Sequence, residues 1–185
     1  MKKEGRVNYI SKKSGQVWIE TVLYTLIGLL MIGLVLYYAV PTIEQAKDEA
    51  LISQSTLMLE EINSMIIRMG PPGSQDTIDL WIKEGELVIN GSNNGDNLIF
   101  KMETTKLASE EGLEVGVGSV NMTATKKNDI SLVELALNYS GKYNITIDGE
   151  DKVKTLSKAS TPYNLLITNN GKGGTDLLQI DLSVE

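Results

Sequence analysis

The side chain with the clearest chemical consequence is Glu20, a carboxylate at the start of a long apolar run. Residues 17–19 (Val-Trp-Ile) precede it, and Thr21–Val40 follows without a single charge. A carboxylate beside hydrocarbon costs on the order of 2–3 kcal/mol at depth and less near the membrane interface. Two interpretations follow. Either Glu20 marks the membrane boundary, or it awaits a positive partner supplied by another chain or by a newly made N-terminus.

The sequence contains no histidine and no cysteine. Without cysteine, the chain has no disulfide, thiolate nucleophile, iron–sulfur cluster or zinc site of the usual kind. Without histidine, it lacks the commonest general base near neutral pH and every Ser-His-Asp arrangement. No other catalytic constellation is recognisable. We therefore expect a non-enzymatic protein with no catalytic residue and no cofactor.

Two short motifs resemble ligand sites but lack features that such sites need, and the first is better explained as a turn. The loop Asn93–Asn97 (NNGDN) is rich in oxygen ligands, yet it lacks the spaced ligands and the closing Glu of an EF-hand calcium loop. The segment Gly116–Gly118 (GVG) is too short for a dinucleotide fingerprint and does not open a helix. We predict no metal ion at the first motif and no nucleotide at the second.

Charge is distributed unevenly along the chain. The formal net charge is −7, but five of the 17 basic residues lie in the first 13 positions: Lys2, Lys3, Arg6, Lys12 and Lys13. Without residues 1–15, the chain has 12 basic and 23 acidic side chains and a charge of −11. Because an acidic protein of this kind repels phosphate backbones, we expect no nucleic-acid partner.

The uncharged run Thr21–Val40 has the length and composition of a transmembrane helix. Its 20 residues, at about 1.5 Å each, span about 30 Å, the thickness of a bilayer's hydrocarbon core. Tyrosines stand toward both ends, where aromatic rings settle at the interfaces. The basic cluster before the run favours a cytoplasmic N-terminus and places the remainder outside. No small-residue cleavage site follows the run, so we expect the segment to be retained.

Residues 12–20 (KKSGQVWIE), followed by a long apolar helix, resemble the class III signal peptide of archaeal type IV pilins and pilin-like proteins. The resemblance implies that a prepilin peptidase recognises Lys12 and Lys13. It also implies cleavage between Gly15 and Gln16 on the cytoplasmic side, with the apolar segment kept in the mature chain.

The same resemblance assigns a role to Glu20, which lies five residues after Gly15. It implies that this carboxylate pairs with the new α-amino group of a neighbouring subunit during assembly. Such a pair is reasonable, because a buried carboxylate and ammonium are tolerable together and costly apart. Trp18 and Tyr24 differ from the Ser and Leu that the family often has at these places.

A single helix is predicted from about Val17 to Met69. Pro41 lies one residue past the apolar run, where it bends a helix without having to end it. Beyond it, apolar residues recur at helical steps among charged ones, so the second half is loosely amphipathic. We expect that half to pack on its own head and on neighbouring subunits. Gly70–Ser74 (GPPGS) then ends the helix.

After Ser74 the apolar pattern alternates, which predicts strands separated by turn residues. Eight strands are expected: Thr77–Ile82, Glu86–Asn90, Asn97–Glu103, Ser119–Thr125, Ile130–Asn138, Lys142–Ile147, Tyr163–Thr168 and Leu177–Val184. The predicted fold class is therefore α+β, a long N-terminal helix followed by an all-β, sandwich-like head. The predicted boundaries are a leader over residues 1–15, the helix over 16–69, a Gly/Pro linker over 70–75 and the head over 76–185.

Four N-glycosylation sequons fall in the predicted head, at Asn90, Asn121, Asn138 and Asn144. Because the motif is modified only on an exported, accessible chain, these sequons support surface exposure. Asn138 is the best placed of the four, at a predicted strand end, whereas Asn144 is expected inside a strand.

The expected function is that of a structural subunit in an archaeal type IV pilus-like surface filament, serving adhesion. The chain would be made as a membrane precursor, cut after Gly15 and polymerised with identical subunits or related pilins at the cell surface. The alternative is a membrane-anchored extracytoplasmic β-domain that binds a ligand without polymerising, or a minor pilin or pseudopilin. Sheared surface filaments, examined for this chain, would separate the two.

Overall fold

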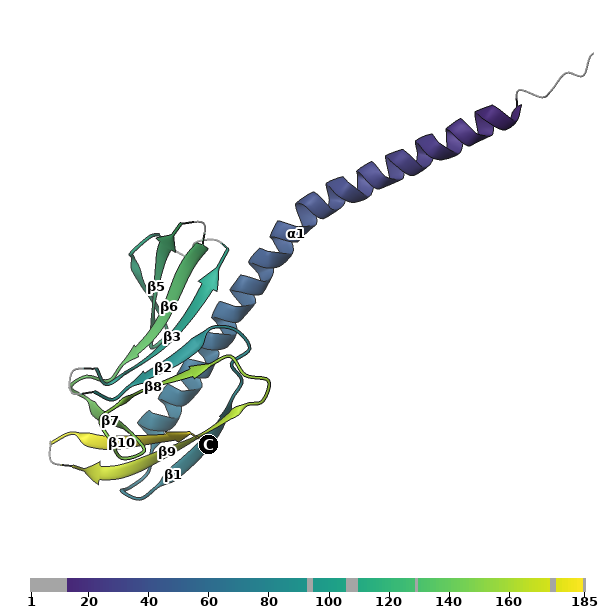
Figure 1. The fold of residues 1–185 in the computed structure, drawn as a ribbon. Coiled ribbons are helices and arrows are strands. Elements are labelled where there is room, and N and C mark those ends of the chain that lie inside the picture. Colours follow the sequence, from purple (N-terminus) through teal and green to yellow (C-terminus); the bar gives the residue numbers. More distant parts are fainter. Residues whose placement is uncertain (1–12, 93–94, 106–109, 129, 174–175, 185) are drawn as a thin grey trace, which may run out of the picture. The chain divides into compact units, whose positions relative to one another are not determined.

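The computed structural model describes residues 13–92, 95–105, 110–128, 130–173 and 176–184 of the 185-residue chain. These residues form one helix and ten strands (Figure 1). The elements in chain order are α1 (Lys13–Arg68), β1 (Gln75–Leu80), β2 (Glu86–Asn90), β3 (Asn97–Thr104), β4 (Glu114–Val117), β5 (Val120–Lys127), β6 (Ile130–Asn138), β7 (Tyr143–Ile147), β8 (Val153–Ser157), β9 (Tyr163–Lys172) and β10 (Leu178–Val184). This order confirms the α+β class.

Helix α1 contains 56 residues and continues through Pro41. It ends at Arg68, one residue before the predicted end at Met69. The chain divides into two compact units, Met1–Glu44 and Gln45–Glu185. The C-terminal part of α1 therefore belongs to the same unit as the strands. We call Gln45–Glu185 the head from here on.

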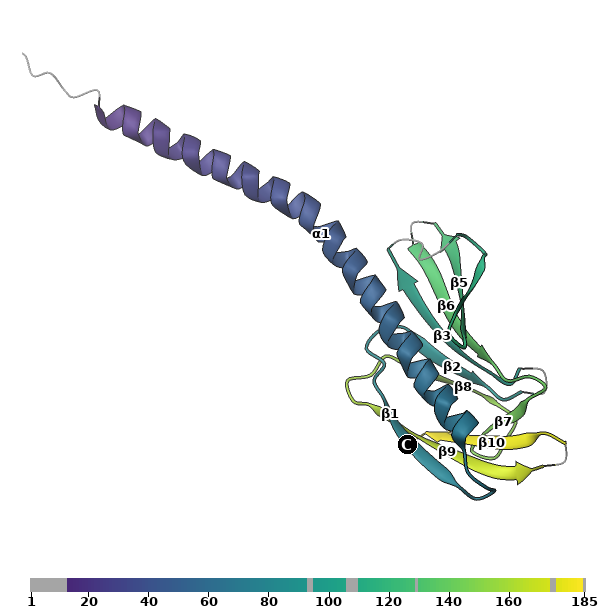
Figure 2. The same ribbon diagram turned by 180° about the vertical axis from the view of Figure 1, so that it is seen from behind.

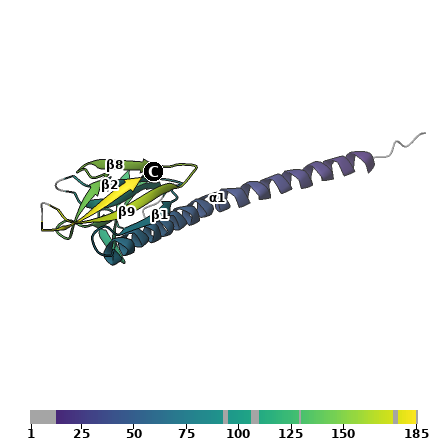
Figure 3. The same ribbon diagram turned by 90° about the horizontal axis from the view of Figure 1, so that it is seen from below.

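The strands form two sheets. The four-stranded sheet has the order β1-β9-β10-β7, and the six-stranded sheet has the order β4-β5-β6-β3-β2-β8. The β7–β10 pair is parallel, and the other paired strands are antiparallel. The view from behind shows strands of both sheets beside the C-terminal part of α1 (Figure 2). Seen from below, the strands gather on one side of that part of the helix (Figure 3).

The helix and both sheets contribute to one hydrophobic core. Leu59, Ile62 and Ile66 of α1 are 0–1% exposed, and their spacing places them on one helix face. The strands supply alternate residues to the same core, as in β6, where buried and half-buried positions alternate from Ser131 to Leu137. The predicted alternation in this strand is confirmed. The helix is therefore part of the head's interior as well as its connection to the N-terminal segment.

Two strands were not predicted from the sequence. In β4, three of the four residues are exposed, so the strand shows no apolar alternation. In β8, a single residue, Leu156, is buried. Both lie at the edges of the six-stranded sheet, and one pairing partner is enough to hold them. Edge strands of this kind carry little burial signal because only one side of the strand is paired and few side chains are covered.

Strand β9 is longer than predicted and includes part of the segment expected as a turn. Asn169 is 2% exposed within it, and its side-chain oxygen accepts a hydrogen bond from the backbone N–H of Gly171 at 2.8 Å. Gly171 has a φ of 79°, in the left-handed region that glycine adopts at little cost. The register of β10 against β9 shifts at Gln179 and Ile180, opposite this irregularity. Asn169 and Gly171 thus form a turn-like hydrogen bond within β9 without ending the strand.

Candidate functional site

The N-terminal part of α1 presents an apolar surface that the described chain leaves uncovered. Its large hydrophobic residues between Val17 and Ile43 are 47–84% exposed, with Tyr37 the most exposed of them. Among the described residues, this is the one helix long and apolar enough to cross a membrane, and an export signal near the N-terminus would meet the same description. We call Val17–Ile43 the apolar segment.

The few hydroxyl groups of the apolar segment bond to their own helix. Thr21 Oγ1 donates to the carbonyl oxygen of Val17 at 2.9 Å, and Thr25 Oγ1 donates to that of Thr21 at 2.7 Å. Thr42 Oγ1 repeats the arrangement with the carbonyl of Tyr38 at 3.0 Å. Because such bonds satisfy the hydroxyl donor locally, these threonines present mainly a methyl group outward. The segment is therefore more apolar than its composition indicates.

Glu20 is exposed on the first part of this segment. One helical turn later on the same face stands Tyr24, which is 70% exposed. The backbone at Lys13, Gly15 and Gln16 is also helical, which places the predicted cleavage bond within α1. The predicted recognition residue Lys12 lies outside the described residues, as do Asn93 and Asn94 of the predicted turn.

The C-terminal part of α1 holds the head through polar side chains as well as through its apolar face. Asp48 Oδ2 accepts hydrogen bonds from the backbone N–H and the hydroxyl of Thr105, at 2.8 and 2.6 Å. Glu60 Oε1 accepts one from the backbone N–H of Ser119. These two carboxylates bind loops of the six-stranded sheet at two positions along the helix.

A third polar contact is buried and joins α1 to the turn after β6. The hydroxyl of Tyr139 donates to Asn63 Oδ1 at 3.2 Å, and the two residues are 3% and 6% exposed. The ring of Tyr139 also makes an edge contact with Tyr143, with centroids 5.8 Å apart. Burial is the main cause that raises the pKa of Tyr139 well above its usual range. The phenol therefore stays neutral and remains a donor.

The linker after α1 is fixed by Asn169 of β9. Its Nδ2 donates to the carbonyl of Gly70 at 2.8 Å, and its backbone carbonyl accepts from Gly73 N–H at 2.7 Å. Its own backbone N–H donates to the carbonyl of Ser74 at 3.0 Å. Sequence reasoning missed this role because Asn169 stands in a run of turn-forming residues, which hides a buried asparagine.

An open groove of about 570 Å³ lies in the head between α1 and the segment after β1. Leu57 and Trp81, at 66% and 57% exposure, are among its lining residues, together with buried Phe100. The groove was not predicted, because it joins a helix face to a strand end that is distant in the sequence. The available signal was the large aromatic Trp81 standing directly after a strand.

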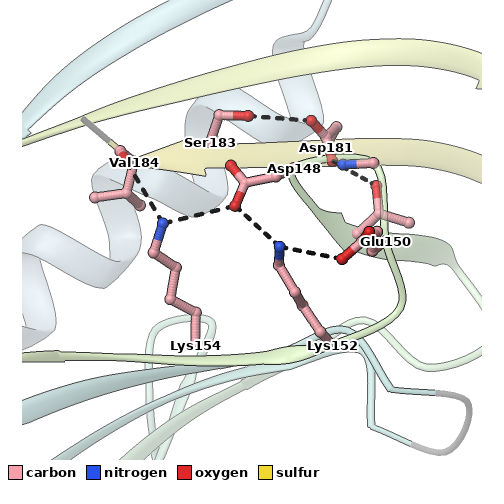
Figure 4. Close-up of polar contacts among 9 residues, drawn as sticks. Asp148, Glu150, Lys152, Lys154, Asp181, Ser183 and Val184 are labelled. Atoms are coloured by element: carbon pink, nitrogen blue, oxygen red, sulfur yellow. Dashed lines mark hydrogen bonds and ion pairs between the residues drawn. The ribbon is translucent and has the colours of Figure 1, made fainter.

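A group of charged residues gathers near the end of β7 (Figure 4). Lys152 Nζ lies 3.2 Å from Asp148 Oδ2 and 3.3 Å from Glu150 Oε2. Lys154 Nζ lies 3.7 Å from the same Asp148 oxygen and 3.5 Å from the carbonyl of Val184. The hydrogen bond from Lys152 is the main cause that lowers the pKa of Asp148, and the same bond raises the pKa of Lys152.

Asp181 of β10 completes this group. Its Oδ1 accepts from the backbone N–H of Gly149 at 2.7 Å and from the hydroxyl of Thr146 at 2.8 Å, and Oδ2 accepts from Ser183 at 3.2 Å. Among the residues that the structure describes, no three His, Cys, Asp or Glu side chains are arranged to hold a metal ion. The group cross-links β7, β8 and β10.

The four sequon asparagines occupy different environments in the head. Asn138, the last residue of β6, and Asn121, within β5, are exposed. Asn90, the last residue of β2, and Asn144, within β7, are half-buried. The expected positions of Asn138 at a strand end and of Asn144 inside a strand are both confirmed.

No family model, no curated protein and no solved structure matches this chain. The predicted functional residues fall into two groups, one in each compact unit. The cleavage and assembly residues, Gly15, Gln16 and Glu20, belong to the unit Met1–Glu44, and the sequons belong to the head.

Proposed function

We propose that this chain is the structural subunit of an archaeal type IV pilus-like surface filament that serves adhesion. A prepilin peptidase cuts the membrane-inserted precursor between Gly15 and Gln16. The mature chain then polymerises with identical subunits or related pilins through its N-terminal helix. The observation that carries the proposal is the apolar segment Val17–Ile43, whose large hydrophobic side chains are 47–84% exposed and which has one carboxylate, Glu20, near its start.

Exposed apolar surface of this extent must be shielded from water both in the membrane-inserted precursor and in the polymer. Lipid covers it in the precursor, and helices of other subunits cover it in the polymer. Because apolar side chains gain little hydrophobic energy on leaving lipid for another helix, close packing and polar pairs must specify the assembly. Glu20 is suited to that role through a pair with the α-amino group of Gln16 of another subunit.

The head supplies the outer surface in this proposal. A contact between subunits that does not close on itself produces a helical polymer instead of a ring. The head is acidic and keeps α1 as part of its core. Heads displayed in this way repel each other at long range, so the helices must provide the main attraction between subunits.

The first test is the mass of the chain isolated from its native cells. Intact-mass and peptide mass spectrometry should find a mature N-terminus at Gln16. A start at Met1 or Lys2 would contradict pilin-type processing and leave a signal-anchored β-domain that binds a ligand without polymerising. A start beyond Val40 would contradict both and indicate an ordinary secreted protein.

The second test separates processing from assembly. We expect Glu20→Ala to be cleaved normally but to yield few or no filaments in the sheared surface fraction. Glu44→Ala is the matched control, because it removes an exposed carboxylate from the same helix beyond the apolar run. Normal filaments from Glu20→Ala cells would overturn the role given to this carboxylate.

A further inference from the structure

Three of the four sequons lie side by side at one end of the head, and the fourth, at Asn121, begins opposite Ala136, two residues before Asn138 in β6. Asn90 pairs with Asn97, and Asn97 pairs with Asn138, so these residues align across the neighbouring strands β2, β3 and β6. Gly91 approaches β7 so closely that a Cβ atom added to it would overlap the carbonyl of Ile145. The sequon at Asn144 is therefore beside the sequon at Asn90.

Contacts with α1 identify which end this is. Tyr139, directly after Asn138, bonds to Asn63 of the helix. Thr105, directly after the opposite end of β3, bonds to Asp48. Fifteen helical residues separate Asn63 from Asp48, which corresponds to about 22 Å along the axis. The three sequons thus gather at the end of the head near Asn63, remote from the point where α1 enters the head.

The sequon at Asn138 is the most accessible of the four. Asn138 and Ser140 are both exposed, and the segment after Asn138 leaves the sheet for a turn. Tyr139 between them is buried and the Ser140 hydroxyl donates to the carbonyl of Gly95 at 2.7 Å, but no other sequon of the four has both its asparagine and its hydroxyl residue exposed. Asn138 Oδ1 accepts a hydrogen bond from the backbone N–H of Ser140 at 2.9 Å, which fixes the amide over the turn. Among the described residues, its Nδ2 has no hydrogen-bond partner.

Two other sequons are closed by packing. In the first, Gly91 is buried between β7 and β8, and its N–H donates to the carbonyl of Lys152 at 3.0 Å. In the sequon at Asn144, the hydroxyl residue Thr146 is 2% exposed and donates to Asp181. A large enzyme cannot reach either segment without opening the fold.

The sequon at Asn121 is held within a sheet. Its backbone lies in β5, paired on one side with β4 and on the other with β6. The Asn121 amide nitrogen already donates to Glu114 Oε1 at 2.6 Å. Its side chain is exposed, but the segment is not free to leave the ladder.

We infer that Asn138 is the N-glycosylated residue of this head, and that the other three sequons stay unmodified on the folded chain. The donor would be an oligosaccharide linked to a lipid phosphate. A bond forms between Asn138 Nδ2 and the anomeric carbon as the carbon–oxygen bond to the phosphate breaks. The lipid phosphate leaves, and the amide proton is lost to a base. The inference requires export of the head but not polymerisation.

Trypsin separates the four sequons, which makes the test direct. Cleavage at lysine places Asn90, Asn121, Asn138 and Asn144 on the peptides 84–101, 107–126, 128–142 and 143–152. Mass spectrometry of the chain from native cells should find a glycan on peptide 128–142 and unmodified forms of the other three. An unmodified peptide 128–142, or a glycan on any of the others, would overturn the inference.

Variants provide a second, independent measurement on the full chain in its native cells. Asn138→Gln should lose one glycan mass from the intact protein, whereas Asn121→Gln, at the other exposed sequon, should lose none. Ser140→Thr keeps the sequon and should keep the glycan. An unchanged glycan mass in Asn138→Gln would contradict the assignment. Because the mature N-terminus is read in the same spectra, failure of this inference is distinguishable from failure of pilin-type processing.

Discussion

The two parts of α1 are built from similar apolar residues but have opposite environments. Large hydrophobic residues between Val17 and Ile43 are 47–84% exposed, whereas Leu59, Ile62 and Ile66 are 0–1% exposed. The first part is apolar all round, and the second is apolar on one face with charged residues between. Apolar content therefore does not decide burial within this chain. The arrangement of apolar residues around the helix decides it, because an apolar stripe on one face of a helix can pack against the head while the opposite face stays in solvent.

Carboxylate and amide side chains of the second part also bind the head, whereas hydroxyl groups in both parts bond to their own helix. In the second part, Asp48, Glu60 and Asn63 all accept hydrogen bonds from distant loops of the same chain. In the first part, the threonine hydroxyls bond to their own helix. The second part is thus matched to an intrachain partner, while the first is suited to lipid or to another helix.

Removing a buried side chain from the second part should destabilise the head. We expect Ile62→Ala to lower the free energy of unfolding by about 2–5 kcal/mol, because it removes buried methyl groups and leaves a cavity. Urea unfolding of the full chain in detergent measures the change. Leu57→Ala is the matched control on the same helix, and because Leu57 is 66% exposed, its loss should be well below that of Ile62→Ala. Equal losses would contradict the comparison.

A charge in the first part should act on the membrane and leave the head unaffected. We expect Leu30→Asp to raise the free energy of membrane insertion of this helix by about 3 kcal/mol. The unfolding free energy of the head should stay within about 0.5 kcal/mol of the parent value. An insertion assay of the helix and urea unfolding of the full chain check the two statements, with Leu30→Ala as control. A destabilised head would show that the first part contributes to it.

The buried phenol of Tyr139 should make the head less stable at alkaline pH. Tyr139→Phe leaves Asn63 Oδ1 without its donor, so we expect a loss of about 1–3 kcal/mol at neutral pH. Because the folded-state pKa is raised, the contribution of the neutral phenol is complete below the unfolded pKa of about 10 and decreases as the pH rises further. Urea unfolding from neutral to alkaline pH should show a shallower decline in the variant. Parallel curves would exclude this role.

The ion-pair group near the end of β7 should have the smallest effect. The pKa of Asp148 is lowered, so its contribution is present at neutral pH and is lost as the pH falls through the acidic range. Because the group is exposed, solvent and salt screen it. We expect the urea midpoint of Asp148→Asn to depend slightly less on acidic pH than that of the parent chain. This difference should be smaller at high salt. An acid dependence in Asp148→Asn equal to that of the parent chain would contradict this contribution.

The sequence predicted those features whose signal is local. The helix end at Arg68 follows from Gly70–Ser74, where a glycine suited to the helix C-terminus precedes two consecutive prolines. Strands β2 and β6 were predicted with correct bounds because each is a short run rich in aliphatic residues with turn-forming residues on both sides. The exposed apolar segment was equally evident, since no polar face interrupts it. In each case a few neighbouring residues were sufficient.

Features that depend on distant partners were missed. Strand β4 exists because β5 pairs with it, although its own side chains are mostly exposed. The neighbours of Asn169 in the sequence predict a turn, yet its side chain binds a linker almost 100 positions earlier. The contact between Tyr139 and Asn63 also joins positions 76 residues apart. No local pattern encodes such pairings, because the energy that favours them arises only after the chain has folded.

The hydrogen bonds that Asn169 forms with Gly70, Gly73 and Ser74 have a mechanical consequence. Tension applied to the N-terminal end of α1 runs along the helix and reaches the head at residues 48–66, where it acts as shear across many contacts. It reaches the linker only after those contacts yield, and there three hydrogen bonds of one residue share the load. The contacts along the helix thus resist a pull together, as in a lap joint, and the three bonds of the linker bear load only after them.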